Sequence, residues 1–75
     1  MTQVMTRAVN SKILVNDEAF MIEANHTYGV CCVLSVFNRT TQLSLLNVGS
    51  SEWIAYDTPK DKTGRAVRVE AFQVR

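Results

Sequence analysis

The residues best suited to chemistry in this chain are two adjacent cysteines, Cys31 and Cys32, and one histidine, His26. The cysteines lie in a run rich in β-branched and aromatic residues, which predicts a strand. Successive side chains of a strand point to opposite faces, so the two sulfur atoms cannot bind one metal ion together. We therefore expect free thiols without a metal or another cofactor. The alternative is an intermolecular disulfide from a cysteine that faces a partner chain.

The acidic residues do not form the carboxylate pair that acid–base catalysis requires. Glu23 and Glu70 interrupt predicted strands, and the other acidic residues open a strand or lie in turns and loops. No local feature would aim His26 at Cys31 as a catalytic base. Because no nucleophile, base and oxyanion donor come together, we expect that the protein is not an enzyme.

Basic residues gather in the last quarter of the chain, which holds five of the eight. A loop that brought them together could contact phosphate groups. Aromatic rings before the loop could stack on the bases of single-stranded nucleic acid. The predicted anion or nucleic-acid site consists of Lys60, Lys62, Arg65, Arg68, Trp53 and Tyr56. Three nearby acidic residues dilute this charge, and a solvated loop is the alternative interpretation.

These residues must be positioned by short strands that turn-forming residues separate. We predict strands at 12–15, 19–24, 28–37 and 52–56, and another from residue 65 to the end. The residues Asn16 and Asp17 tolerate the left-handed backbone of a tight turn between the first two. A second turn is expected at "NHTYG", residues 25–29.

Two segments have a less regular pattern. Residues 42–53 show the alternation of a strand, although the spacing of Leu43 and Leu46 also allows a short helical turn near 41–48. In "RAVRVEAFQVR" the apolar phase changes, which predicts a β-bulge near Ala71. We expect one all-β domain over residues 1–75. Its fold would be a small antiparallel barrel or rolled sheet of five to seven short strands, similar to SH3, Sm or OB barrels.

The predicted strand 28–37 is apolar on both faces. Cys32, Leu34 and Val36 share one face, and Cys31, Val33 and Phe37 share the other. The same alternation places Tyr28 and Val30 on the face of Cys32. A chain of 75 residues with 47% apolar content has little interior in which to bury a second face. We therefore expect self-association or a protein assembly partner. The predicted interface consists of Cys31, Val33, Phe37, Phe72 and Val74.

The bulk properties limit the classes of partner. A net charge of +1 and an isoelectric point near 7.8 provide no strong field toward nucleic acid or anionic membranes. No apolar run approaches the roughly 20 residues of a membrane helix, and the first residues do not resemble a signal peptide. We expect a cytoplasmic protein or a component of a virion, without a membrane partner.

The leading hypothesis is a non-enzymatic β interaction module that forms homo-oligomers or joins a larger assembly. It would be a structural or accessory protein of viral or mobile-element origin. One alternative is a single-stranded nucleic-acid-binding barrel that uses the basic loop 60–68. Another is binding of a small, nucleotide-like ligand at an interface between subunits.

Overall fold

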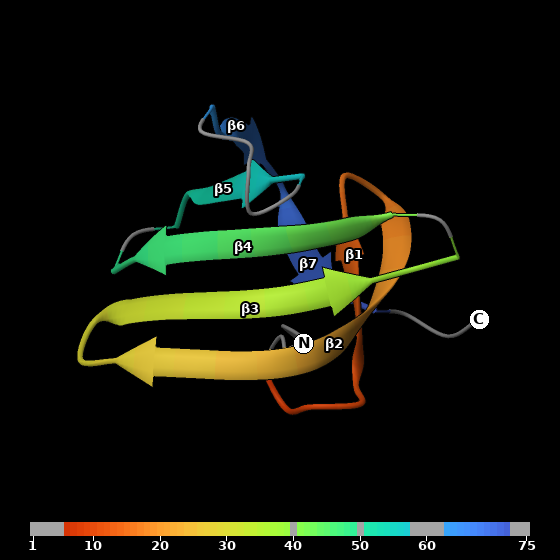
Figure 1. The fold of residues 1–75 in the computed structure, drawn as a ribbon, viewed down its shortest axis with the longest axis horizontal. Helices are drawn as coiled ribbons and strands as arrows, with labels where there is room; N and C mark the ends of the chain where they lie inside the picture. Colours follow the sequence, from red (N-terminus) through yellow and green to blue (C-terminus); the bar gives the residue numbers. More distant parts are fainter. Residues whose placement is uncertain (1–5, 40, 50, 58–62, 73–75) are drawn as a thin grey trace, which may run out of the picture.

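The computed structural model describes residues 6–39, 41–49, 51–57 and 63–72, and these form strands and turns without a helix. The seven strands are β1 (Lys12–Val15), β2 (Glu18–Tyr28), β3 (Cys31–Phe37), β4 (Gln42–Val48), β5 (Trp53–Tyr56), β6 (Arg65–Val67) and β7 (Val69–Ala71). They form one antiparallel sheet in the order β6-β5-β4-β3-β2-β1-β7 (Figure 1). The described part of the chain therefore holds no helix of the length and apolar character that crossing a membrane requires.

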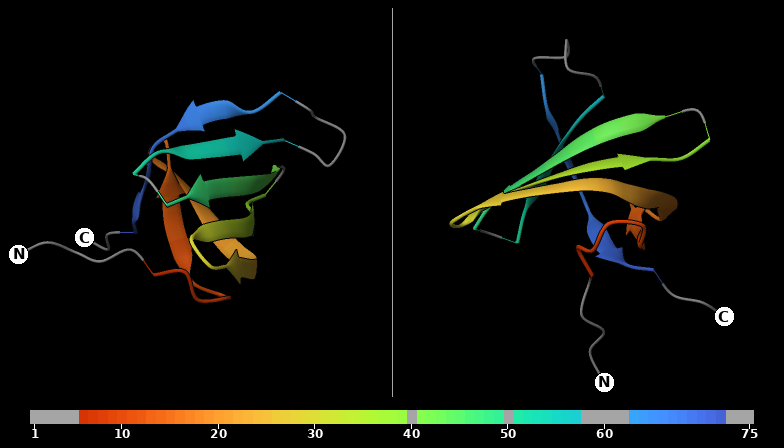
Figure 2. Two further views of the ribbon diagram at one scale, coloured as in Figure 1. Left: turned by 90° about the vertical axis from the view of Figure 1, so that its left-hand side faces the viewer. Right: turned by 60° about the horizontal axis from the view of Figure 1, so that its bottom comes forward.

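The sheet curls into a nearly closed barrel because one bent segment forms both of its ends (Figure 2). Strand β6 pairs with β5, β7 pairs with β1, and only Arg68 separates β6 from β7. The all-β prediction of a small antiparallel barrel with five to seven strands is confirmed. Consecutive strands are neighbours from β1 to β6, which is a meander and not the Greek-key order of an OB barrel.

Two-residue turns connect the strands of the first two hairpins. Asn16 and Asp17 have φ angles of 50° and 69°, the two positive values of a type I′ turn, so this predicted turn is confirmed. Gly29, with φ 57°, occupies the first central position of the next turn, as in type II′. The predicted turn at residues 25–29 is wrong, because β2 continues to Tyr28 and only Gly29 and Val30 form the turn.

Two further expectations on local structure need correction. Residues 42–48 form strand β4, so the short helical turn near 41–48 is absent and the strand alternative is correct. The last segment bends at Arg68, three positions before the predicted bulge at Ala71. A register shift does occur in the sheet, but it lies in β2 between Ile22 and Ala24.

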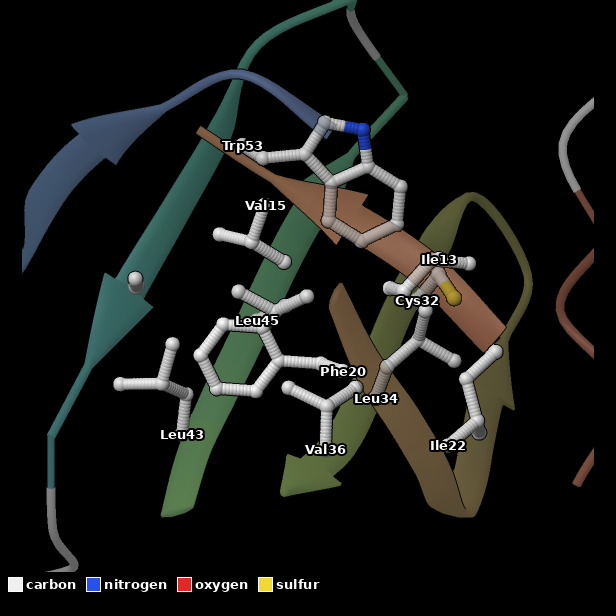
Figure 3. Packing of buried hydrophobic residues seen from close by; sticks show 11 residues of the cluster. Ile13, Val15, Phe20, Ile22, Cys32, Leu34, Val36, Leu43, Leu45 and Trp53 are labelled. Atoms are coloured by element: carbon white, nitrogen blue, oxygen red, sulfur yellow. The ribbon is translucent and has the colours of Figure 1, made fainter. Parts of the chain in front are cut away.

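The core lies on the concave side of the sheet and takes residues from β1 to β5 (Figure 3). Burial alternates along each strand, so that Cys32, Leu34 and Val36 point inward from β3. Each buried aliphatic or aromatic side chain contributes about 1.5–3 kcal/mol relative to leaving it exposed. The cluster consists of Ile13, Val15, Phe20, Ile22, Cys32, Leu34, Val36, Leu43, Leu45, Trp53 and Ala55.

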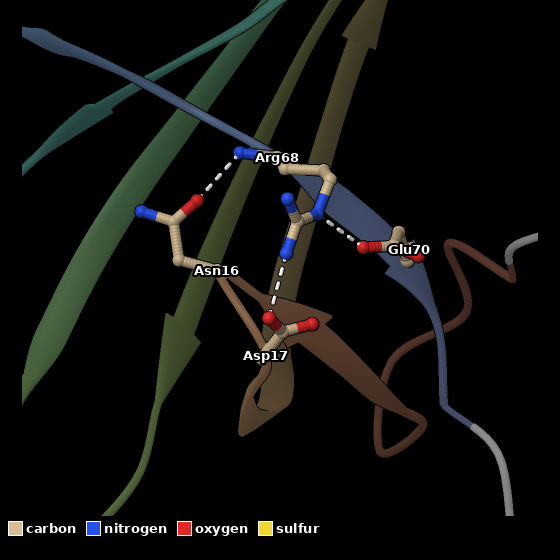
Figure 4. Close-up of polar contacts among 4 residues, drawn as sticks. All are labelled: Asn16, Asp17, Arg68 and Glu70. Atoms are coloured by element: carbon tan, nitrogen blue, oxygen red, sulfur yellow. Dashed lines mark hydrogen bonds and ion pairs between the residues drawn. The ribbon is translucent and has the colours of Figure 1, made fainter.

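Polar contacts hold the point where the barrel closes (Figure 4). The backbone N–H of Arg68 donates to Asn16 Oδ1 at 2.8 Å, and the N–H of Asn16 donates to the Arg68 carbonyl at the same distance. The Arg68 guanidinium contacts Asp17 at 2.7 Å and also contacts Glu70. The β1–β2 turn is thus fastened to the bend between β6 and β7.

Candidate functional site

An apolar row crosses the outer face of the barrel. It consists of Val33 on β3, Leu46 on β4 and Ile54 on β5, which lie directly opposite one another in the strand register. All three are half-buried, and His26 on β2 and Ala66 on β6 extend the row at its ends. Directly opposed side chains on one face of an antiparallel pair contact each other. The row therefore forms one continuous apolar strip on the side away from the core.

The tip of the β2–β3 hairpin extends this strip with strongly exposed apolar side chains. Tyr28 is 71% exposed and Val30 is 77% exposed. Tyr28 is paired with the half-buried Cys31. The preceding pair, Thr27 and Cys32, faces inward, so Tyr28 and Cys31 lie on the outer face. Together, Tyr28, Val30 and Cys31 carry apolar surface from the apolar row to the end of the hairpin.

A second apolar stripe lies at the other end of β3. Phe37, which is 39% exposed, is paired with Met21 on β2, and Met21 is paired with Lys12 on β1. The ammonium group of Lys12 lies over the Phe72 ring, 5.4 Å from its centroid. The second stripe therefore runs from Phe37 through Met21 and Lys12 to Phe72.

The structure divides the predicted interface between these two places. Cys31 and Val33 belong to the region of the apolar row, whereas Phe37 and Phe72 belong to the second stripe. Val33 and Phe37 are four positions apart along β3, a distance of about 13 Å in an extended chain. Val74 lies outside the described residues.

The two cysteines point to opposite faces of β3, as the strand pattern predicts. Cys32 is 1% exposed in the core, while Cys31 is half-buried on the outer face, and both are free thiols. The Thr27 hydroxyl lies 3.6 Å from the Cys32 sulfur and donates to Asn25 Oδ1 at 2.6 Å. In the described ranges, no three His, Cys, Asp or Glu residues are grouped so that they could hold a metal ion.

The predicted anion site is not assembled by the residues that the structure describes. Arg65 pairs with Asp57 at 2.7 Å, and Arg68 pairs with Asp17 and Glu70. The hydrogen bonds that Arg68 donates to Glu70 and Asp17 raise the pKa of Arg68 above its usual value, because they stabilise the charged guanidinium. Lys60 and Lys62 lie outside the described residues.

The two aromatic residues of that site lie on different sides of the sheet. Trp53 is 5% exposed and its ring lies in the core, with the Arg7 guanidinium 5.2 Å from the ring centroid. A nucleic-acid base therefore cannot stack on it while the core is closed. Tyr56 is half-buried on the outer face, and a Cβ atom placed on Gly64 would lie 2.9 Å from its ring. The backbone at Gly64 thus covers part of this ring.

A cavity of about 810 Å³ opens between the β1–β2 turn, the start of β4 and the facing ends of β5 and β6. Val15, Phe20 and Leu43 line its apolar part. Its polar lining includes Glu18, and also Asp57 and Arg65, which are paired with each other. The volume is in the range of small-ligand sites, and the polar lining carries one carboxylate more than it carries basic groups.

Four surface residues were missing from the predicted interface: Tyr28, Val30, Leu46 and Ile54. A signal for two of them was present, because Leu46 follows the buried Leu45 and Ile54 follows the buried Trp53. Each is an apolar residue out of phase with the core. The prediction that Tyr28 and Val30 share the face of Cys32 is wrong, because the turn at Gly29 and Val30 interrupts the alternation and places Tyr28 on the outer face.

Comparison with known proteins finds no protein-family model, no curated protein and no solved structure that matches this chain.

Proposed function

We propose that the protein is a non-enzymatic β-barrel interaction module, which associates with copies of itself or joins a larger assembly as a structural or accessory component. The observation that carries this proposal is the apolar row Val33–Leu46–Ile54 on the outer face, together with the exposed Tyr28 and Val30. Transfer of such surface from water to a protein interface is favourable by about 25 cal/mol per Å² of apolar area.

The distribution of charged residues supports the same proposal. Most acidic side chains in the described part of the chain join strands or turns to one another. Glu18 accepts a hydrogen bond from Asn38, Glu23 accepts one from Gln42 at 2.9 Å, and Asp57 pairs with Arg65. These contacts give the charged groups a role in holding the barrel, whereas the apolar row makes no such polar contacts between strands.

The proposal can be tested by placing a charge in the apolar row. Val33→Glu should shift the protein to a smaller species in sedimentation velocity, because a partner would have to desolvate the carboxylate. Ser35→Glu is the matched control, since residue 35 lies two positions along β3 on the same outer face but outside the row. Circular dichroism would show that both variants fold. Equal sedimentation of wild type and both variants would contradict the role of the row.

A second candidate function is small-ligand binding in the cavity of about 810 Å³. Its support is the combination of an apolar part with the side chains of Glu18, Asp57 and Arg65. A ligand that binds only the folded chain must raise its stability, so a thermal-shift screen with nucleotides and with small cationic ligands tests it. A melting temperature that no ligand changes would count against this function.

A further inference from the structure

We propose that two copies of this chain join by antiparallel pairing of the segment Ala24–Tyr28 of β2, so that one sheet continues through both copies. This inference rests on the proposed self-association and specifies its partner and geometry. In Figure 1 the second half of β2 runs along the edge of the sheet formed with β3 and β4, past the end of β1. We call this segment the β2 edge.

The β2 edge is open because β1 covers only the first half of β2. Pairing of β1 with β2 ends at Lys12 and Met21, and hydrogen bonds of Asn10 and Ser11 with Ile22 continue it by one residue, at 2.8 Å each. Beyond Ile22, no strand in the described ranges pairs with β2 on the side away from β3. Unpaired backbone groups at such an edge are a template for another strand.

Because the register of β2 shifts at Glu23, the backbone groups of Ala24–Tyr28 that face the open side must be counted from the β2–β3 turn. Tyr28 and Cys31 flank a two-residue turn and therefore form a hydrogen-bonded pair. Hydrogen-bonded and non-hydrogen-bonded pairs alternate, so His26 and Ala24 also bond toward β3. The N–H and C=O groups of Asn25 and Thr27 then point to the open edge.

The side chains of these two residues are held on the interior side of the strand. The Thr27 hydroxyl donates to Asn25 Oδ1, and Asn25 Nδ2 donates to the Arg7 carbonyl at 2.9 Å. They are opposite the buried Leu34 and Cys32 in the register of β3. Their side-chain contacts are therefore made on the interior side and do not use the backbone groups that point to the edge.

A second copy fits this edge in one register. If Asn25 of each copy pairs with Thr27 of the other, all four edge groups of each chain form hydrogen bonds at once. A two-fold axis then passes beside His26, and the two His26 residues oppose each other as a non-hydrogen-bonded pair on the outer face. Tyr28 of each copy lies opposite the small side chain of Ala24 in the other.

Two properties of the segment favour this occupant. It contains neither lysine nor proline, the residues that commonly protect sheet edges from pairing. In addition, His26 ends the apolar row, so pairing about His26 brings the rows of the two copies together into one apolar surface. An unrelated strand would match the hydrogen bonds but would not provide this continuity.

Cysteine crosslinking tests the register in the full chain. In a Cys31→Ser background, His26→Cys should form a disulfide-linked dimer under mild oxidation, because opposed residues of such a pair have Cα atoms about 4.5 Å apart. Ala24→Cys is the matched control, because residue 24 lies on the same face of the same strand. In the proposed register, residue 24 of one copy lies four positions away from residue 24 of the other. The rate with His26→Cys should exceed that of the control by on the order of tenfold or more, as expected for a preformed contact. A mixture of Ala24→Cys and Tyr28→Cys chains should crosslink between the two variants.

Sedimentation of the same samples without oxidant separates the two proposals. A dimer that crosslinks equally at residues 24 and 26 overturns the β2-edge register and leaves the self-associating module standing. A monomer at all concentrations, with slow crosslinking in every variant, overturns both the pairing and the self-association, and leaves only the part of the proposed function in which the chain joins a larger assembly. Rapid crosslinking at residue 26 and in the mixture supports the proposed pairing.

Discussion

Val67 and Val69 are two positions apart in the chain but lie on opposite ends of the sheet. Val67 pairs with Trp53 of β5, and Val69 pairs with Val15 of β1. Both pack against the core, so the segment that contains them closes the barrel from the two sides at once. Arg68, the residue between them, is where the hydrogen bonds change from one neighbour to the other.

The contact of Asn16 with this bend should contribute to stability. Asn16→Gly keeps a residue that adopts positive φ readily but removes the oxygen that accepts the Arg68 N–H. We expect the free energy of unfolding to fall by about 1 kcal/mol, the typical net value of a hydrogen bond. Chemical denaturation measures this change.

The control for that variant is Asn10→Gly. Asn10 also has a positive φ, of 74°, but its backbone N–H donates to Ile22 of β2 and not to the bend. It therefore reports the cost of glycine at such a position without the closing contact. Equal losses in the two variants would show that the Asn16 side chain does not stabilise the closure.

The guanidinium of Arg68 should stabilise the fold throughout the neutral and mildly alkaline range. Its pKa is raised in the folded protein by the hydrogen bonds that it donates to Glu70 and Asp17. A raised folded-state pKa means that the contribution is fully present below the unfolded-state pKa and is lost as pH rises through the folded-state value. The difference in unfolding free energy between wild type and Arg68→Gln should therefore be constant from about pH 7 to about pH 10. A steady decline of this difference within that range would contradict the assignment.

The two faces of β3 should respond very differently to truncation. Leu34 is fully buried, so Leu34→Ala should cost about 2–5 kcal/mol and leave little folded protein in a domain of this size. Val33→Ala, on the outer face, should cost less than about 1 kcal/mol in the monomer, since Val33 is only half-buried. Thermal unfolding of both at low protein concentration measures the contrast. Similar losses at the two positions would mean that the outer face is packed as tightly as the core.

The cysteines should differ in accessibility for the same reason. A thiol reagent added to the folded protein should modify Cys31 first, because Cys32 is 1% exposed. The Cys31→Ser variant should then react only as fast as the protein opens, while Cys32→Ser should keep the fast phase. Fast reaction of the Cys31→Ser variant would place Cys32 outside the core.

Local chemistry in the sequence was sufficient for several elements of this fold. Asn16 and Asp17 specify their turn because few other residues adopt two successive positive φ angles. The alternation of Trp53 and Ala55 with Ile54 and Tyr56 correctly separated the two faces of β5. In both cases, the determining interactions lie within a few residues of one another.

Features that depend on distant partners were not predictable in the same way. The change in apolar phase predicts a bend near Ala71. The bend occurs at Arg68, because the residues before it pair with β5 and the residues after it pair with β1. The turn at Gly29 was hidden in an apolar run, since Val30 and Tyr28 resemble strand residues. The apolar row required the register of three strands, which no single segment contains.

The measurement that tests the central claim most directly is residue-resolved amide hydrogen exchange at low and high protein concentration. If the protein self-associates by pairing of the β2 edge, the amides of Asn25 and Thr27 should exchange rapidly in dilute solution and slowly in concentrated solution. The Tyr28 amide, which bonds within the hairpin, should be protected in both. Exchange rates at Asn25 and Thr27 that do not change with concentration, in a protein that sediments as an 8.4 kDa monomer throughout, would contradict the account.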